Sequence, residues 1–294
     1  MFKDLVEKKL VKEKKYSNGL AIYKYNNRVF YDNLWHLDSR LLEARGMVLN
    51  DDGEKVIWPF TKVFNRFENN TDCDPHSLVE MVEKVNGFMA AARMWDGELI
   101  VSSTGTLDSD YVKLARKVIT DCKPLHKDFW NDHAGLTLMF EICDESDPHI
   151  VEEKSGAYLI GARHMVTGEM LQEAQLDAIA DDGGFLRPAH SLIFFDQLTQ
   201  IVKTCKKEGY MVRDGYSGKY LMKIKSPHYL IKKFLMRMSD TKTKLMFTDT
   251  YKLFQQVDEE FYHVVEWITA SFTEEQWTSL SDQERRTKLE EYLG

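Results

Sequence analysis

The sequence predicts an α+β fold in which a large part built from antiparallel strands is followed by a small all-helical part. Three observations support this class. Residues up to about 225 read mostly as short strands and turns, apolar residues recur at helical spacing after that point, and the local charge reverses between the two parts. Acidic residues outnumber basic ones, 47 to 39, which excludes a protein with a basic surface throughout.

The clearest predicted element is a β-hairpin whose turn is Asp96-Gly97. An Asp-Gly pair supplies the positive φ angles of a tight type I′ turn. Residues 88–95 and 98–103 should therefore pair as antiparallel strands. Further strands are predicted at residues 46–49, 56–58, 136–142, 157–163, 210–213 and 220–225.

Helices are predicted from the spacing of apolar residues and from capping signals. Residues 109–122 carry one apolar stripe and should form a surface helix, and residues 230–238 and 254–268 repeat the helical period. Two capping boxes follow, at 273–276 and 281–284, each with a hydroxyl residue three positions before Gln or Glu.

Charge divides the chain near residues 229–250. Residues 201–237 hold ten basic and two acidic residues, a local charge of +8, whereas residues 251–294 hold four basic and ten acidic residues, a charge of −6. We therefore predict two domains, at 1–240 and 241–294. The apolar faces of the tail should pack together and on the 230–238 helix, and its negative charge should repel polyanions, which predicts a structural cap.

Targeting and redox signals are absent from the sequence. No apolar run approaches the roughly 18 residues of a membrane span, and no signal-peptide pattern opens the chain. The four cysteines are far apart and form no CxxC pair, so we expect free thiols. These features predict a cytoplasmic protein that does not bind membranes.

The most informative segment surrounds Lys84, which lies just before the hairpin. A lone Lys-x-x-Gly tetrapeptide is a weak signal, because a solvated lysine before a turn is more common. Here, however, it is accompanied by other motifs in a fixed order. These are Arg45-Gly46 and Phe60-Thr-Lys62-Val-Phe64-Asn65 upstream, and Met139-Phe-Glu141-Ile142, Glu208-Gly209-Tyr210 and Lys223-Ile-Lys225-Ser226 downstream.

This order resembles that of the covalent nucleotidyltransferases, the ligases and capping enzymes that form a lysyl-nucleotide. It is most similar to the phage RNA ligases of the tRNA-repair type, over residues 31–229. Lys-Ile-Lys-Ser at 223–226, with Tyr229 just beyond, is the most specific part. The resemblance implies an antiparallel-sheet, ATP-grasp-like adenylyltransferase domain with a nucleotide cleft, followed by the helical domain. It also implies ATP-dependent joining of RNA 5′-phosphate and 3′-hydroxyl ends in RNA repair.

The resemblance implies a role for each cationic motif. Lys84 would attack the α-phosphate of ATP and form a lysyl-AMP, from which AMP passes to the RNA 5′-phosphate before a 3′-hydroxyl displaces it. Lys223 and Lys225 match catalytic positions that hold the α-phosphate, and Arg45 and Lys62 match positions that hold the β and γ phosphates. Nucleotidyl transfer needs such converging cations, because it moves negative charge between oxygens.

The acidic motifs are predicted to bind metal and nucleotide. Glu141 and Glu208 have the hard oxygen ligands that Mg²⁺ or Mn²⁺ prefers, with Glu208 favoured as the metal ligand and Glu141 as an alternative partner of the ribose hydroxyls. Glu83 is predicted to accept a hydrogen bond from the adenine amino group, and Gly87 to line the nucleotide site.

Two positions depart from the family pattern. The usual Lys-x-Asp-Gly has Asn86 in place of the aspartate, so a metal carboxylate is missing there. The tRNA-repair ligases also place a lysine near the position of Thr104, so one cation of the usual pocket is missing.

Several alternatives remain open at this point. A DNA ligase or mRNA-capping nucleotidyltransferase usually carries an OB-fold, against which the helical tail argues. A non-catalytic RNA-binding protein would need no glutamates among its lysines, because they would repel the phosphate backbone. The expected partners are single-stranded or nicked RNA, with tRNA as a candidate and DNA ends left open, and the expected state is a monomer in the cytoplasm, that of the host if a bacteriophage encodes the chain.

Overall fold

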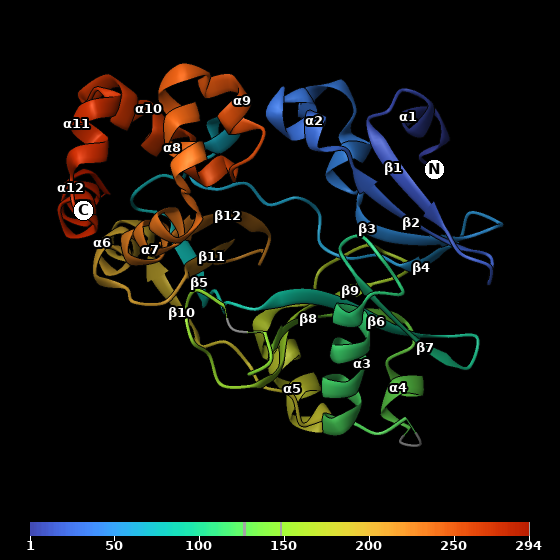
Figure 1. Ribbon diagram of the computed structural model, residues 1–294. Helices are drawn as coiled ribbons and strands as arrows, with labels where there is room; N and C mark the ends of the chain where they lie inside the picture. Colours follow the sequence, from blue (N-terminus) through green and yellow to red (C-terminus); the bar gives the residue numbers. More distant parts are fainter. Residues whose placement is uncertain (126–127, 148, 294) are drawn as a thin grey trace.

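The computed structural model describes residues 1–125, 128–147 and 149–293 and consists of three four-stranded antiparallel sheets and a C-terminal group of helices. Figure 1 shows the helical tail at the upper left, above β11 and β12, and the blue N-terminal part at the upper right. Gly294, the last residue of the predicted helical domain, lies outside the described residues. Within them, no helix combines the length and apolarity that crossing a bilayer requires.

The first sheet is formed by the N-terminal segment in the order β1-β2-β3-β4. Its apolar face packs under short helices, with Trp35, Leu41 and Met47 buried in one cluster. The strands are β1 (Val11–Lys15), β2 (Leu20–Tyr25), β3 (Arg45–Asn50) and β4 (Lys55–Ile57), and the helices are α1 (Lys3–Glu7), α2 (Asn27–Tyr31), η1 (Leu34–Leu37) and η2 (Ser39–Leu42).

The second sheet has the order β7-β6-β8-β9 and contains the predicted hairpin. Asp96 and Gly97 both have positive φ, and the paired strands have the predicted bounds, so the hairpin prediction is confirmed. The helices α3 and α5 contribute to the core that this sheet buries. The elements are β6 (Phe88–Trp95), β7 (Glu98–Ser103), α3 (Asp110–Cys122), α4 (Phe129–Asp132), β8 (Leu136–Cys143), β9 (Gly156–His164) and α5 (Glu173–Gly183).

The third sheet joins segments far apart in the sequence, in the order β10-β5-β11-β12. Its helix α6 (Phe195–Thr204) packs on one face through Phe195 and Leu198. Arg213 is fully buried and forms an ion pair with the buried Glu173 of α5, which links this sheet to the second one. The strands are β5 (Leu78–Glu83), β10 (His190–Phe194), β11 (Gly209–Asp214) and β12 (Tyr220–Lys225).

The C-terminal helices share one apolar core. Phe234, Val264 and Trp277 are buried in it, so α7 packs with the later helices as predicted. Both capping boxes are present, since the side chains and backbones of residues 273 and 276 and of 281 and 284 exchange hydrogen bonds. The helices are α7 (Pro227–Arg237), α8 (Asp240–Thr248), α9 (Thr250–Phe254), η4 (Glu259–Phe261), α10 (Tyr262–Ser271), α11 (Glu274–Ser279) and α12 (Asp282–Leu293).

One predicted helix is wrong in its extent. Residues 254–268 do not form a continuous helix, because α9 ends at Phe254 and the helical path resumes only at η4. The apolar residues Val257 and Phe261 are nevertheless buried, since the irregular segment folds over the same core. The break places Glu259 beside Lys62 and Glu260 beside Lys225 of β12. The domain boundary at 240 stays a prediction. Helix α7, which lies before it, packs in the core of the tail.

Candidate functional site

Lys84 lies in the short connection that carries the chain from the third sheet to the second. Strand β5 ends at Glu83 and β6 begins at Phe88, so Lys84 stands between two sheets. Its backbone N–H donates to the carbonyl of Gly209 at 2.9 Å, which fixes its position beside β11. Its side chain is 21% exposed, so it is accessible from the space between the sheets.

Glu208 is the central carboxylate of this site. The pairing of β5 with β11 and of Gly209 with Lys225 brings it beside two lysines. Its Oε1 lies 3.1 Å from Nζ of Lys84 and forms an ion pair with Lys225. Burial alone would raise the pKa of Glu208, but Lys84 and Lys225 reverse this effect and hold the pKa at about 2. Glu208 is therefore ionised throughout the physiological range.

Gly209 allows this close packing of β11 on β12. Its φ is +138°, and a Cβ on this residue would lie 2.0 Å from the carbonyl oxygen of Ile224. Only glycine fits this position. The Glu-Gly sequence at 208–209 therefore has a steric reason as well as a chemical one.

Glu141 reaches the site from the second sheet. It lies on β8 opposite Met89, and its Oε1 accepts a hydrogen bond from the Gly87 N–H at 3.1 Å. Burial raises the pKa of Glu141, an effect that the nearby charge of Lys84 opposes. Gly87 itself has no room for a side chain, because a Cβ would lie 2.2 Å from the carbonyl oxygen of Ile142.

Lys62 and Lys223 are brought together by a short parallel contact. The Lys223 N–H donates to the Phe64 carbonyl at 2.8 Å, and the Arg66 N–H donates to the Lys223 carbonyl at 2.8 Å. The segment after β4 therefore runs along β12. Burial, together with the charges of Lys62 and Lys225, lowers the pKa of Lys223 to about 7.

Arg45 and Glu83 occupy the margins of the site. Arg45 begins β3 of the first sheet, and its charge contributes to the lowered pKa of Lys223. Glu83 ends β5 and forms an ion pair with Lys207 at 3.1 Å, and Lys207 also contacts the buried Glu153 at 2.7 Å. Sequence reasoning did not single out Lys207 or Glu153, because neither belongs to a motif.

The two departures from the family pattern have distinct surroundings. The Asn86 amide donates to Glu208 Oε2 at 2.8 Å and accepts from the Val151 N–H at 2.9 Å, so it orients the central carboxylate. Thr104 lies against Gly46, and the half-buried Lys24 of β2 extends to the neighbouring Gly105. Burial lowers the pKa of Lys24, and the charges of Lys12 and Arg45 lower it further. A cation from β2 therefore stands beside the turn where the family lysine is missing.

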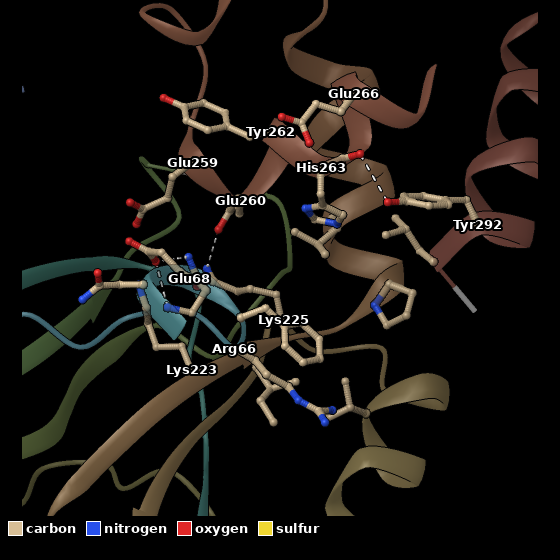
Figure 2. A pocket seen from close by; sticks show the side chains of 18 of the residues that line it. Arg66, Glu68, Lys223, Lys225, Glu259, Glu260, Tyr262, His263, Glu266 and Tyr292 are labelled. Carbon is tan, nitrogen blue, oxygen red and sulfur yellow. Dashed lines mark hydrogen bonds and ion pairs between the residues drawn. The ribbon is translucent and has the colours of Figure 1, made fainter. Parts of the chain in front are cut away.

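Two carboxylates of the C-terminal helices, those of Glu259 and Glu260, lie in the site. Lys62 Nζ lies 2.7 Å from Glu259 and 3.2 Å from Glu68, and Lys225 Nζ lies 3.4 Å from Glu260. Glu68, Lys225, Glu259 and Glu260 line a cavity of about 840 Å³ between the sheets and the tail. Figure 2 shows Glu259 and Glu260 extending from the tail, with Glu260 directed at Lys225. No sequence pattern indicated this contact.

The donor set is compatible with a hydrated divalent ion rather than a protein-enclosed one. No group of three or more His, Cys, Asp or Glu side chains arranged to hold a metal is found among the described residues. Glu141 and Glu208 are buried carboxylates near Lys84. They lie close enough that the charge of Glu208 adds to the raised pKa of Glu141. Two such carboxylates suit Mg²⁺, which keeps several of its waters.

Comparisons with known proteins concern the sequence family and the fold. The sequence matches the model of the RNA ligase family over residues 43–229, more than half of the chain. No curated protein matches the sequence. In structure, the chain is similar to form 1 of an archaeal ATP-dependent RNA ligase, with a TM-score of 0.64 and 14% identity over 98% of this chain and 75% of that one.

Two further structures give the same fold. Form 2 of the archaeal ATP-dependent RNA ligase has a TM-score of 0.64 and 14% identity, over 99% of this chain and 76% of that one. A protein from Aquifex aeolicus, provisionally named an ATP-dependent DNA ligase, has a TM-score of 0.63 and 13% identity over 98% and 75%. Because the sequence identities are this low, these similarities establish a shared fold and nothing further.

Proposed function

The chain belongs to the RNA ligase family and is an enzyme that ligates RNA, and we propose that it does so with ATP, through a lysyl-AMP on Lys84 and an adenylated RNA end. The observation that carries the proposal is the position of Lys84 between two sheets, 3.1 Å from Glu208, which also pairs with Lys225. Transfer of label from α-labelled ATP to the protein tests it.

The first step forms a covalent bond to the lysine. As a neutral amine, Lys84 Nζ attacks the α-phosphorus of ATP, a P–N bond forms, and the bond to the β-phosphate oxygen breaks with release of pyrophosphate. The ammonium of Lys84 is paired with Glu208, so the amine has to lose its proton and leave this pair before it attacks. Lys223 and Lys225 stabilise the charge on the α-phosphate, and Arg45 and Lys62 hold the phosphates that leave.

The later steps transfer AMP and seal the strand. The RNA 5′-phosphate displaces Lys84 from the AMP phosphorus, and the 3′-hydroxyl then attacks the activated 5′-phosphate and releases AMP. Lys223 and Lys225 face a phosphate in every step, whereas Lys84 bonds only in the first two. The proton of the attacking hydroxyl leaves to solvent or to a nearby base.

Glu208 and Glu141 are the residues that would hold a divalent ion, Mg²⁺ or Mn²⁺. When bound, such an ion neutralises charge on the phosphates. Glu141 alternatively accepts from the ribose hydroxyls, and Glu83 accepts from the adenine amino group while Gly87 leaves room at the pocket wall. Asn86 keeps the Glu208 carboxylate oriented.

Arg45 and Lys62 should affect the ATP step more than sealing. Alanine at either position should depress lysyl-AMP formation by about 10²-fold, because each removes a cation from the phosphates that depart before RNA is joined. Sealing of a pre-adenylated strand should fall less than about threefold. Rates of both half-reactions, measured on the same preparation, check this. Equal losses in the two assays would mean that the residues support RNA binding or the fold.

Binding of ATP should be accompanied by uptake of a proton by Lys223. With its pKa near 7, the lysine is mostly neutral at pH 8, and the phosphates favour its charged form, so binding should add about one proton. Calorimetry at pH 8 in buffers of different ionisation enthalpy measures this number. Lys223→Arg, which stays charged, is the control and should lack the uptake. Identical proton uptake in both proteins would contradict the assignment.

For the substrate, the proposal names a class of nucleic acid. We propose single-stranded or nicked RNA as the natural class, with tRNA as one candidate in RNA repair, and a monomer of an adenylyltransferase domain (1–240) with a helical domain (241–294) as the working unit. Sealing assays on matched RNA and DNA ends test whether DNA is accepted.

A further inference from the structure

The tail places carboxylates on the lysines that the proposed reaction needs for phosphates. Glu259 contacts Lys62, and Glu260 contacts both Lys225 and Lys233. The three lysines are almost fully buried, with side chains that are 4%, 9% and 10% exposed. A buried ammonium needs an anionic partner, because its transfer out of water is otherwise very costly.

These carboxylates sit on an element that could move as a unit. Phe261, the next residue, is buried against Phe234 in the tail core, with ring centroids 5.5 Å apart, so η4 is fixed to the tail rather than to the sheets. The chain between Phe254 and η4 is irregular, which exposes this acidic edge to the sheets. Glu259 and Glu260 would therefore leave Lys62 and Lys225 together with the tail, whereas Lys233 of α7 belongs to the tail itself.

The contacts of the tail with α2 and its C-cap include two hydrogen bonds and a ring contact of Phe30 with Tyr262, whose centroids lie 6.1 Å apart. The Tyr31 hydroxyl donates to the Gln255 carbonyl at 2.6 Å, and the Tyr251 hydroxyl donates to Asp32 at 3.3 Å. Both bonds are exposed to solvent. Exposed hydrogen bonds contribute little net stability, so opening this edge costs less than unfolding the tail core, which contains Phe261.

We propose that Glu259 and Glu260 occupy the positions of ATP phosphates on Lys62 and Lys225 and so hold the enzyme in an autoinhibited state. ATP opens this state by displacing the two carboxylates. The inference rests on the proposed function, since it concerns the lysines assigned to the phosphates of ATP. The carboxylates line the cavity of about 840 Å³ between the sheets and the tail, so a polyphosphate has space beside these lysines.

The local electrostatics favour displacement by a stronger anion. Glu259 lies beside Glu68 on the same lysine, and burial together with Glu68 raises the pKa of Glu259 to about 7. Two carboxylates close together repel each other when both are ionised. A polyphosphate carries more charge than this pair, and while the glutamates remain in place they repel it. Binding of phosphates and closure of the tail therefore exclude each other.

Binding of inorganic tripolyphosphate tests the contact without any covalent chemistry. Titration calorimetry should compare the wild type with the double variant Glu259→Gln/Glu260→Gln. Neutral amides compete poorly for the lysines, so the variant should bind the probe about tenfold more tightly, since a closed state lowers apparent affinity by the fraction that is open. Glu266→Gln is the matched control, because Glu266 lines the same cavity and is exposed. Its affinity should equal that of the wild type.

A second variant keeps the test decisive if the double variant folds poorly. Tyr31→Phe removes the hydrogen bond to Gln255 and should tighten tripolyphosphate binding by about two- to threefold. Unchanged or weaker binding in the double variant, or in Tyr31→Phe when the double variant is unfolded, would overturn the proposal. The failure of the proposed function is separate: it would appear as wild-type protein that acquires no label from α-labelled ATP, whatever the result with tripolyphosphate.

Discussion

Replacing Lys84 by alanine should abolish formation of the lysyl-AMP while the protein keeps its fold. The side chain is partly exposed in a connection between strands and contributes no core packing, whereas it supplies the only atom proposed to bond to the α-phosphorus. Loss of a nucleophile removes most of the catalysis, so the label transferred from α-labelled ATP should fall by at least about 10⁴-fold. Sealing of a pre-adenylated RNA strand should remain, because that step does not use the lysine.

Two controls make this result specific. Lys84→Arg keeps the positive charge beside Glu208 but lacks the amine, so it should also fail to acquire label. Lys113→Ala removes an exposed lysine that forms an ion pair with Asp110 on the surface of α3 and should behave as the wild type. Label retained on denatured Lys84→Ala protein would refute the assignment of the nucleophile.

Replacing Glu208 by glutamine should damage both stability and activity. The variant leaves Lys84 and Lys225 around a buried neutral amide, and breaking a buried pair by removing one partner costs about 3–5 kcal/mol of unfolding free energy. Lysyl-AMP formation should fall by about 10³-fold, because the group that orients both lysines and is proposed to hold the metal is lost. Denaturant unfolding and label transfer measure the two effects.

The stability loss should depend on pH with a definite sign. The folded-state pKa of Glu208 is lowered from 4.5 to about 2, so the stabilisation is fully present above about pH 4.5 and is lost as the pH falls towards 2. The difference between the wild type and Glu208→Gln should shrink over this range. Glu152→Gln, at an exposed position, should show no such difference. A difference that does not change with pH would mean that the carboxylate charge is not the stabilising feature.

Local signals made much of the fold predictable. The Asp96-Gly97 turn fixed the hairpin, and the strand that contains Lys223 and Lys225 was predicted with its correct bounds, because each depends on residues close in sequence. The strands β1, β2 and β10 were not predicted. Strand β10 pairs with β5, more than 100 residues earlier, and such distant pairing leaves no periodic mark in a short segment.

The contents of the site were predictable as a set of motifs, but their connections were not. The order of motifs identified Lys84 and Glu208, which the structure brings to 3.1 Å. The charge of −6 predicted a tail that stays away from phosphates, whereas Glu259 in fact lies 2.7 Å from Lys62, 197 residues earlier in the chain. That contact follows from the break between α9 and η4 and from docking of the tail, and composition alone records neither.

The central claim is that this chain forms a covalent adenylate on one lysine between its two sheets. Mass spectrometry of peptides from the wild-type enzyme, digested after incubation with ATP and without RNA, tests it most directly. We expect a single AMP adduct on the peptide that contains Lys84, and we expect it to disappear when a 5′-phosphorylated RNA strand is added. An adduct on another residue, or RNA sealing by an enzyme that never carries AMP on Lys84, would contradict the account.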